Sequence, residues 1–234
     1  MIAGLQKMTL LDFPGKVACT LFLQGCNFRC PFCHNSELIP RQGEPLMDTD
    51  AFLAFLEKRT GMLDGVCVSG GEPTLCPELE DLLASIKGLG YAVKLDTNGS
   101  RPDVLKSLVE KGLVDYVAMD VKNSPILYPQ TLGFDRYDLK AVEESLRFLM
   151  EDHVAYELRT TVVAQLHSDG SMLEMGRWLA SLLPPKKPRQ LWLQYFTDRD
   201  TVLFSGLSAP TREEMEVYRS LLTPYVGEIA IRGD

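Results

Sequence analysis

Short β-branched or apolar runs alternate with helical patterns along this chain of 234 residues. Six runs predict strands, at 17–23, 65–69, 92–96, 116–120, 156–163 and 190–195. Four amphipathic segments predict helices, at 77–89, 102–111, 139–151 and 213–222. Strands that alternate with helices pair in parallel, and such a sheet either stays open or curls towards a barrel. The pattern predicts an α/β fold without deciding between these two forms.

Composition limits the classes of protein to which the chain can belong. It has 45% hydrophobic and 24% charged residues, enough to bury a core within a single domain spanning 1–234. A formal net charge of −8 argues against nucleic acid as a partner. Residues 1–16 lack the features of a secretory signal, and no apolar run approaches the roughly 18 residues of a membrane span. We expect a cytoplasmic protein without nucleic-acid or membrane partners.

Three of the six cysteines lie within the segment GCNFRCPFCHN, at Cys26, Cys30 and Cys33. Disulfides are rare in a reducing cytosol, so clustered cysteines there more often bind metal or perform redox chemistry. Covalent haem attachment would match CPFCH but requires export. Structural zinc needs a fourth ligand, which His34 could supply only awkwardly. The three cysteines could also be buried core residues without a chemical function. However, the loop 25–35 is too polar and too rich in turns to be a core strand.

An iron–sulfur cluster is the interpretation that this leaves. Thiolates are the ordinary ligands of such clusters, and three of them would leave one iron of a [4Fe–4S] cluster without a protein ligand. A substrate can bind to that open iron.

The Cys-x3-Cys-x2-Cys spacing just after the first strand resembles the radical S-adenosylmethionine enzymes. The resemblance implies a partial (β/α)6 barrel with parallel strands that holds the cluster in the loop after strand one. Gly70, Gly71, Glu72 and Pro73, in CVSGGEPTL, match the family's segment that binds the methionine amino group. LDTNGS and AMDVK end the next two strands, where a barrel keeps its chemistry.

The opening LDFPGKVACTLFLQGCNFRCPFCHN is similar to that of glycyl-radical-enzyme activating proteins, which carry D-x-P-G before the cluster loop. Among these, the chain resembles the longer form of the activating proteins of anaerobic ribonucleoside-triphosphate reductase. Activators of the pyruvate formate-lyase type have a histidine at the end of strand six, where this chain has Gln194, Tyr195 and Phe196. Contacts made through that histidine do not carry over.

The resemblance implies a reaction and its partners. A [4Fe–4S] cluster would reductively cleave S-adenosylmethionine, and the 5′-deoxyadenosyl radical would take a hydrogen from a glycine Cα of a glycyl radical enzyme. A flavodoxin- or ferredoxin-type protein would supply the electron. Two other functions stay open: a radical enzyme acting on a small molecule, similar to 7-carboxy-7-deazaguanine synthase, and a non-catalytic zinc or iron–sulfur module.

The resemblance also implies a set of cofactor-binding residues. Glu72 would accept hydrogen bonds from the methionine ammonium, Lys122 would face the carboxylate and Phe32 the adenine edge. Lys122 could instead be a solvated loop lysine, and Arg159 a salt-bridged barrel arginine. The full set is Phe32, Gly70, Gly71, Glu72, Thr97, Asn98, Lys122 and Arg159. Thr97 and Asn98 would hold the ribose or carboxylate, although Asn98-Gly99 could be only a tight turn.

Three acids near the strand ends, Asp12, Asp96 and Asp120, form a further candidate site. Like charges held close together raise a pKa unless a cation is present. The resemblance implies a monovalent cation at these carboxylates, with Thr97 as a further ligand. The alternative is that Asp12 caps a turn and the other two pair with lysines or backbone amides.

The remaining cysteines and histidines are expected to be structural or exposed. Cys19 and Cys67 fall within strands and predict core positions, whereas Cys76 is expected to be an exposed thiol. His153 and His167 are expected on the surface. His34 and Asn35 are expected to support the cluster loop.

Overall fold

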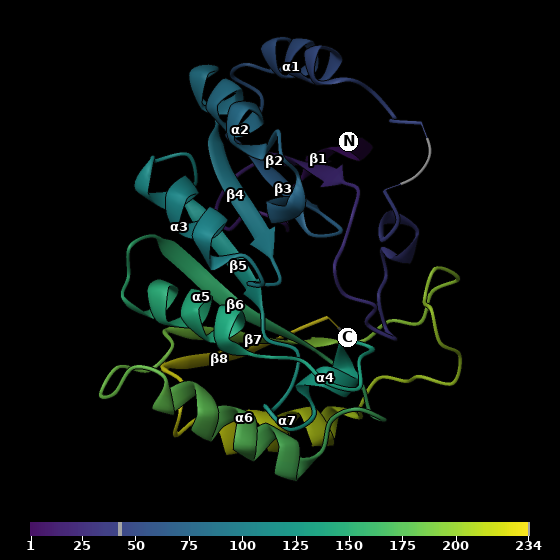
Figure 1. Cartoon of the computed structure of the whole chain (residues 1–234), viewed down its shortest axis with the longest axis vertical. Coiled ribbons are helices and arrows are strands. Elements are labelled where there is room, and N and C mark those ends of the chain that lie inside the picture. The colour runs from purple at the N-terminus through teal and green to yellow at the C-terminus, as the bar shows by residue number, and fades with distance from the viewer. Residues whose placement is uncertain (42–43, 234) are drawn as a thin grey trace.

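The computed structural model describes residues 1–41 and 44–233. In this part of the chain eight strands form one sheet in sequence order (Figure 1). They are β1 (Ile2–Thr9), β2 (Ala18–Leu23), β3 (Gly65–Gly70), β4 (Ala92–Thr97), β5 (Tyr116–Asp120), β6 (Ala155–Val162), β7 (Gln190–Tyr195) and β8 (Glu228–Arg232). Neighbours from β2 to β8 are parallel, and β1 pairs antiparallel with β2. The carboxyl ends of seven strands therefore share one rim.

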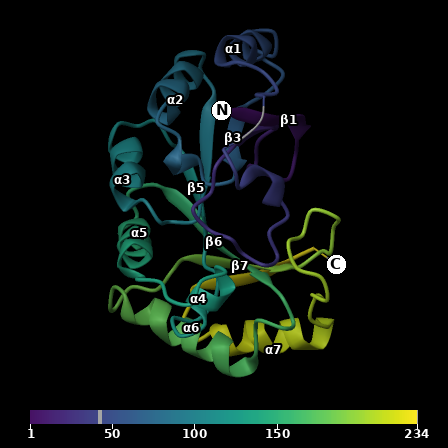
Figure 2. The same ribbon diagram turned by 45° about the vertical axis from the view of Figure 1, so that its right-hand side comes forward.

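Helices connect the parallel strands and cover one face of the curved sheet (Figure 2). They are α1 (Thr49–Glu57), α2 (Leu79–Gly88), α3 (Pro102–Glu110), α4 (Tyr128–Thr131), α5 (Lys140–Met150), α6 (Asp169–Ser181) and α7 (Arg212–Leu222). Two short 3-10 turns, Ser36–Leu38 and Pro73–Leu75, follow the rim loops after β2 and β3. The fold is a partial barrel, which confirms the expected architecture. None of the helices in the described residues combines the length and apolar character that crossing a bilayer requires.

The six predicted strands are β2 to β7, with ends that differ by one residue at most. The predicted helices are α2, α3, α5 and α7. The sequence prediction missed β1, β8, α1, α4 and α6. β1 and β8 are edge strands with partly exposed side chains, so their apolar pattern is weak. α6 contains Gly170 and Gly176, poor helix formers, but a capping box at Ser168 starts it and buried side chains hold it.

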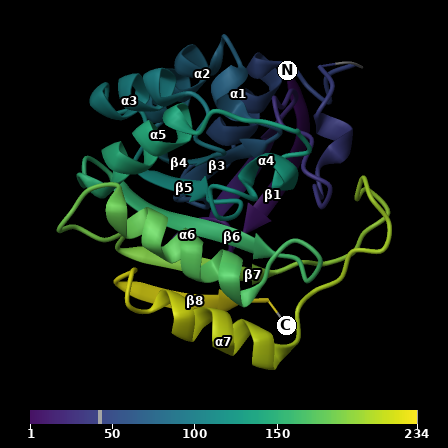
Figure 3. The same ribbon diagram turned by 60° about the horizontal axis from the view of Figure 1, so that its bottom comes forward.

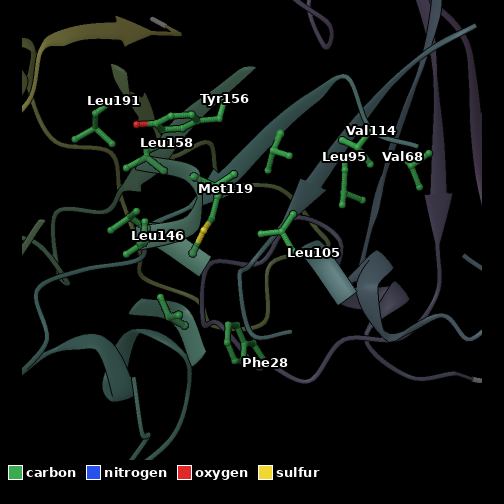
Figure 4. Packing of buried hydrophobic residues seen from close by; sticks show 14 of the residues in the cluster. Phe28, Val68, Leu95, Leu105, Val114, Met119, Leu146, Tyr156, Leu158 and Leu191 are labelled. Atoms are coloured by element: carbon green, nitrogen blue, oxygen red, sulfur yellow. The ribbon is translucent and has the colours of Figure 1, made fainter. Parts of the chain in front are cut away.

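The two faces of the sheet have different chemistry because successive side chains of a strand point to opposite sides. The outer face is apolar, and its strand residues pack with Leu105 of α3 and Leu146 of α5 (Figure 4). Figure 3 shows α6 and α7 lying beside each other over β7 and β8. The inner face carries polar and charged side chains, including Lys94 and Arg159. The rim of this inner face is where the candidate site lies.

One cysteine lies elsewhere than expected. Cys76 was predicted to be an exposed thiol, but it is only 8% exposed because it follows the 3-10 turn Pro73–Leu75 under the start of α2. Its Sγ donates to Glu78 at 3.3 Å. The prediction for Cys76 is therefore wrong, whereas the core positions of Cys19 and Cys67 are confirmed.

The packing of α5 gives a stability test. Leu146→Ala should lower the free energy of unfolding by about 2–5 kcal/mol, because it removes a fully buried side chain between α5 and the sheet. Val217→Ala is the control: Val217 is 44% exposed on α7, so a change within about 0.5 kcal/mol is expected. Urea unfolding under reducing conditions measures both. Equal losses in the two variants would contradict this account of the core.

Candidate active site

The loop after β2 places three thiols around one cavity. Its backbone is anchored by Gly25 and Cys26, whose N–H groups donate to Leu38 and Ile39 carbonyls at 2.7 and 3.1 Å. Cys26, Cys30 and Cys33 all line a cavity of about 190 Å³ at the rim of the barrel. The structure thus brings together the three cysteines that the sequence singled out.

The chemistry of these thiols fits a metal cluster. Burial raises the pKa of Cys30 to about 12 and also raises the pKa values of Cys26 and Cys33. The free thiols are therefore protonated at neutral pH, and a bound metal would deprotonate them. In the described part of the chain no three His, Cys, Asp or Glu side chains are grouped so that they could hold a single metal ion. A [4Fe–4S] cluster spreads its ligands more widely, and three thiolates are its ordinary donor set.

The glycines after β3 allow the backbone to approach the cluster loop closely. Gly70 has φ +120°, and a Cβ there would lie 2.3 Å from the Leu23 carbonyl oxygen. A Cβ on Gly71 would lie 2.3 Å from the Gly25 carbonyl oxygen. Larger residues are excluded by the backbone itself, so both glycines are required for this geometry. The Glu72 N–H donates to the Gly25 carbonyl at 2.7 Å and joins the two loops.

Glu72 is a buried carboxylate that ties two strand ends together. Its side chain is 1% exposed, and Oε1 accepts hydrogen bonds from Thr74 Oγ1 at 2.5 Å and Thr97 Oγ1 at 2.8 Å. Oε1 also accepts from the Thr74 N–H at 3.1 Å, and Oε2 accepts from the Asn98 N–H at 2.6 Å. Burial raises the pKa of Glu72, and these hydrogen bonds oppose that rise. Its expected contact with the methionine ammonium stays a prediction, to which the structure adds this structural role.

A second set of hydrogen bonds joins the end of β4 to the cluster loop. Asn98 Nδ2 donates to Asn27 Oδ1 at 3.0 Å, and Asn27 Nδ2 donates to Ser100 Oγ at 2.9 Å. Asn98 Oδ1 accepts from the Ser100 N–H at 2.9 Å. Asn98 therefore forms the turn that the alternative interpretation proposed and also contacts the cluster loop. Asn27 and Ser100 were missed, since nothing in their spacing marks them as neighbours.

Five charged side chains form a network at the ends of β4, β5 and β6. Lys122 Nζ lies 2.8 Å from Asp120 Oδ2, and Arg159 Nε lies 3.0 Å from Asp120 Oδ1. Arg159 also reaches Asp96 Oδ2 at 3.2 Å, and Lys94 Nζ lies 2.5 Å from Asp96 Oδ1. Arg159 and Lys122 line the cavity as well, so the salt-bridge interpretation of Arg159 holds without excluding cofactor binding. Lys94 was missed as a site residue because a lysine within a strand pattern suggests an exposed face.

The network keeps the two aspartates charged. Burial alone would raise the pKa of Asp120, but Lys122 and Arg159 outweigh it and lower the pKa to about 2. The pKa of Asp96 is lowered in the same way by Arg159 and Lys94 against the effect of burial. The third predicted acid, Asp12, accepts a hydrogen bond from Thr20 Oγ1 at 2.6 Å and is not among the described residues that line the cavity.

The loop after β7 is fastened to the cluster loop. His34 Nε2 donates to the Thr197 carbonyl at 2.6 Å, and Thr201 Oγ1 donates to the His34 carbonyl at 2.7 Å. The Phe204 N–H donates to the Pro31 carbonyl at 3.2 Å. These contacts connect the loop after β2 to the loop after β7, across the open side of the barrel.

Two aromatic rings complete this connection. The His34 ring stacks on Phe196 with centroids 5.6 Å apart. Phe196 lies in the segment where the sequence resemblance predicts a histidine in activators of the pyruvate formate-lyase type. His34 thus supports the cluster loop as expected, and Asn35 does so by donating to the Gly70 carbonyl at 3.2 Å. Phe32 is buried beside Lys122, whose Nζ lies 5.8 Å from the ring centroid.

One histidine contradicts its prediction. His167 was expected on the surface but is 4% exposed. Its Nδ1 accepts from the Val163 N–H at 3.1 Å, and its Nε2 donates to the Lys122 carbonyl at 3.0 Å. These contacts hold the backbone of Lys122 at the rim. The sequence pattern around His167 resembles a loop, and only the tertiary contact buries it.

A comparison with known protein families identifies the segment that contains these cysteines, glycines and strand ends. The model of the Radical SAM superfamily matches residues 20–164, more than half of the chain. The protein belongs to the radical SAM superfamily. The family implies a [4Fe–4S] cluster and S-adenosylmethionine, and the thiols and the polar rim of this radical SAM protein fit both.

Individual relatives of this radical SAM protein cover different lengths of it. A Methanocaldococcus jannaschii protein, named among the glycyl-radical enzyme activating enzymes, is 27% identical over 242 residues, covering 99% of this chain and 95% of the relative. The pyruvate formate-lyase-activating enzyme of Clostridium pasteurianum is 32% identical over 153 residues, covering 61% of this chain and 63% of the relative. A solved domain of a pyruvate-formate lyase-activating enzyme from Bacteroides vulgatus has TM-score 0.58 at 22% identity, covering 72% of this chain and 99% of that domain. This last likeness is one of fold.

The structural role of Glu72 can be measured directly. Glu72→Gln should lower the free energy of unfolding by about 1–3 kcal/mol. The glutamine amide has only one acceptor oxygen, so its NH2 group would face a hydrogen-bond donor that now binds the second carboxylate oxygen. Glu110→Gln makes the same chemical change at an exposed position on α3 and should cost about 0.5 kcal/mol or less. Urea unfolding compares the two. Losses of the same size would show that Glu72 does not hold the strand ends together.

Proposed function

We propose that this radical SAM enzyme activates a glycyl radical enzyme by removing a hydrogen atom from a glycine Cα. The observation that carries the proposal is the similarity to the Methanocaldococcus jannaschii relative, which extends over 99% of this chain. The D-x-P-G segment at 12–15 supports the same assignment. Within this class we infer anaerobic ribonucleoside-triphosphate reductase as the partner and a flavodoxin- or ferredoxin-type protein as electron donor.

The residues around the cavity would hold the two cofactors. Cys26, Cys30 and Cys33 would bind three irons and leave the fourth open to S-adenosylmethionine. When bound, the cluster and S-adenosylmethionine together supply the 5′-deoxyadenosyl radical. The protein's own task is to hold the reactants in position and to exclude water.

The charged rim suits the carboxylate of S-adenosylmethionine. The Lys122 ammonium has three N–H donors, and one of them binds Asp120. The Arg159 guanidinium has five N–H donors, of which two bind Asp96 and Asp120. Both side chains line the cavity, so their remaining donors can orient a carboxylate by charge-assisted hydrogen bonds. Phe32 supplies an apolar surface beside them for the adenine.

The architecture of the sheet supports a macromolecular substrate. β1 and β8 stand at the two ends of the strand order, so in the described residues no strand pairing closes the barrel between them. We infer that a loop of a partner protein approaches the inner face from that side. Such a loop must leave its own site first, a rearrangement common in regulatory complexes.

The cluster ligands give the first test of this function. Cys30→Ala should lose both the iron, about four atoms per chain after anaerobic reconstitution, and the reductive cleavage of S-adenosylmethionine. Cys76→Ala is the matched control, because Cys76 is a buried thiol that does not line the cavity among the described residues. It should keep its iron and its activity. Wild-type production of 5′-deoxyadenosine by Cys30→Ala would refute the assignment of the ligand.

The partner can be tested by electron paramagnetic resonance. Anaerobic mixing with ribonucleoside-triphosphate reductase, S-adenosylmethionine and a reduced flavodoxin or ferredoxin should produce a glycyl doublet on the reductase. The Cys30→Ala protein should produce none. A doublet on a different glycyl radical enzyme would change the partner but keep the activase class. No doublet on any such enzyme, together with turnover of a small molecule, would favour the small-molecule alternative.

A further inference from the structure

Each carboxylate oxygen of Asp96 and Asp120 already binds a basic side chain of the protein. Asp96 Oδ1 lies 2.5 Å from Lys94 Nζ, and Asp96 Oδ2 lies 3.2 Å from the Arg159 guanidinium. Asp120 Oδ1 lies 3.0 Å from Arg159 Nε, and Asp120 Oδ2 lies 2.8 Å from Lys122 Nζ. Three cations thus meet two carboxylates, so this group of five side chains carries a net charge of +1.

Arg159 occupies the position that matters most for a bound ion. Its guanidinium contacts one oxygen of Asp96 and one oxygen of Asp120, and so bridges the two carboxylates as a shared metal ion would. A monovalent ion would need oxygen ligands from the same two side chains, and it would face the guanidinium at close range. The residues present therefore do not fit the monovalent cation that the family resemblance implies.

Lys94 is held in the network by the strand. It lies on β4 two residues before Asp96, so both side chains point to the inner face of the barrel. Lys94 is 1% exposed, and its Nζ also lies 3.8 Å from the Cys67 thiol. A buried ammonium requires a paired carboxylate, because its desolvation is otherwise unfavourable. Pairing with Lys94 therefore engages one oxygen of Asp96.

The third acid does not restore a site for an ion. Asp12 Oδ2 accepts the hydroxyl hydrogen of Thr20 at 2.6 Å. Asp96 Oδ2 also accepts a hydrogen bond from Ser69 Oγ at 3.0 Å, in addition to its contact with Arg159. Both oxygens of Asp96, both oxygens of Asp120 and one oxygen of Asp12 are thus already engaged by donors of the protein.

We propose that Arg159 and Lys94 take the place of the monovalent cation, so that this enzyme binds S-adenosylmethionine without sodium or potassium. The positive charge beside the cavity is then built into β4 and β6 and does not depend on the ionic composition of the solution. Arg159 acts as a positioning residue that holds the two carboxylates and keeps further donors at the cavity. The inference concerns cofactor binding and does not depend on which glycyl radical enzyme is the partner.

The test measures binding of S-adenosylmethionine to the anaerobically reconstituted enzyme by isothermal titration calorimetry. Tetramethylammonium chloride is compared with potassium chloride and with sodium chloride at matched ionic strength. The dissociation constant of the wild type should agree within about twofold in the three salts. A dissociation constant that rises by roughly tenfold when potassium and sodium are both removed would overturn the proposal.

Variants at Arg159 distinguish the role of its guanidinium from that of a bound sodium or potassium ion. Arg159→Gln should weaken binding roughly tenfold or more in tetramethylammonium, because it removes a charge-assisted contact, and potassium or sodium should restore part of it. Arg159→Lys keeps the charge and should stay insensitive to the salt. Arg189→Gln is the control, because this arginine pairs with Asp152 on the exposed surface and should bind as the wild type does.

Thermal unfolding gives a readout independent of the cofactor. Potassium should raise the Tm of Arg159→Gln relative to tetramethylammonium and leave the Tm of the wild type unchanged. If Arg159→Gln does not fold, Lys94→Met is measured in the same way, because it frees one oxygen of Asp96. If neither potassium nor sodium affects binding or Tm in the variant that folds, Arg159 and Lys94 do not substitute for an ion and the proposal fails.

Discussion

The geometry of the barrel rim depends on the hydrogen bonds that the buried carboxylate of Glu72 accepts. Its oxygens accept hydrogen bonds from the turn after β3 and from the end of β4, while its own N–H binds the cluster loop at Gly25. A carboxylate at 1% exposure is unfavourable unless its lone pairs are satisfied, and here four donors satisfy them. The three loops that supply the thiols, the glycines and Asn98 are therefore fixed relative to one another before any cofactor binds.

On the inner face of the sheet, a network of charged side chains meets the same requirement that buried charges have partners. Charges in a partly desolvated barrel need partners, and Lys94, Asp96, Asp120, Lys122 and Arg159 provide them for one another. The same five side chains leave N–H donors of Arg159 and Lys122 directed at the cavity. The residues that pair with one another are thus also the ones proposed to bind the cofactor, and Arg159 is compatible with both interpretations that the sequence allowed.

The connection between the cluster loop and the loop after β7 compensates for an incomplete barrel. β1 and β8 are the edges of the sheet in the described residues, so the rim is joined by contacts between loops and not by a strand ladder. His34 contributes a hydrogen bond to Thr197 and a stacked contact with Phe196. The segment 194–196, where the sequence resemblance predicts a histidine in related activators, thus supports the cluster loop through Phe196.

The sequence alone determined the six central strands, the cysteine loop and the glycines after β3, because these depend on local periodicity, turn chemistry and short spacing. It did not reveal the partners of Lys94, the burial of His167 and Cys76, or the link between Asn27 and Ser100, since residues 27 and 100 become neighbours only when the sheet curls. The sequence could also place Asp96 and Asp120 on one rim from the parallel order of the strands. Only the tertiary structure decided that Arg159 lies between them, because that contact joins residues 39 and 63 positions apart.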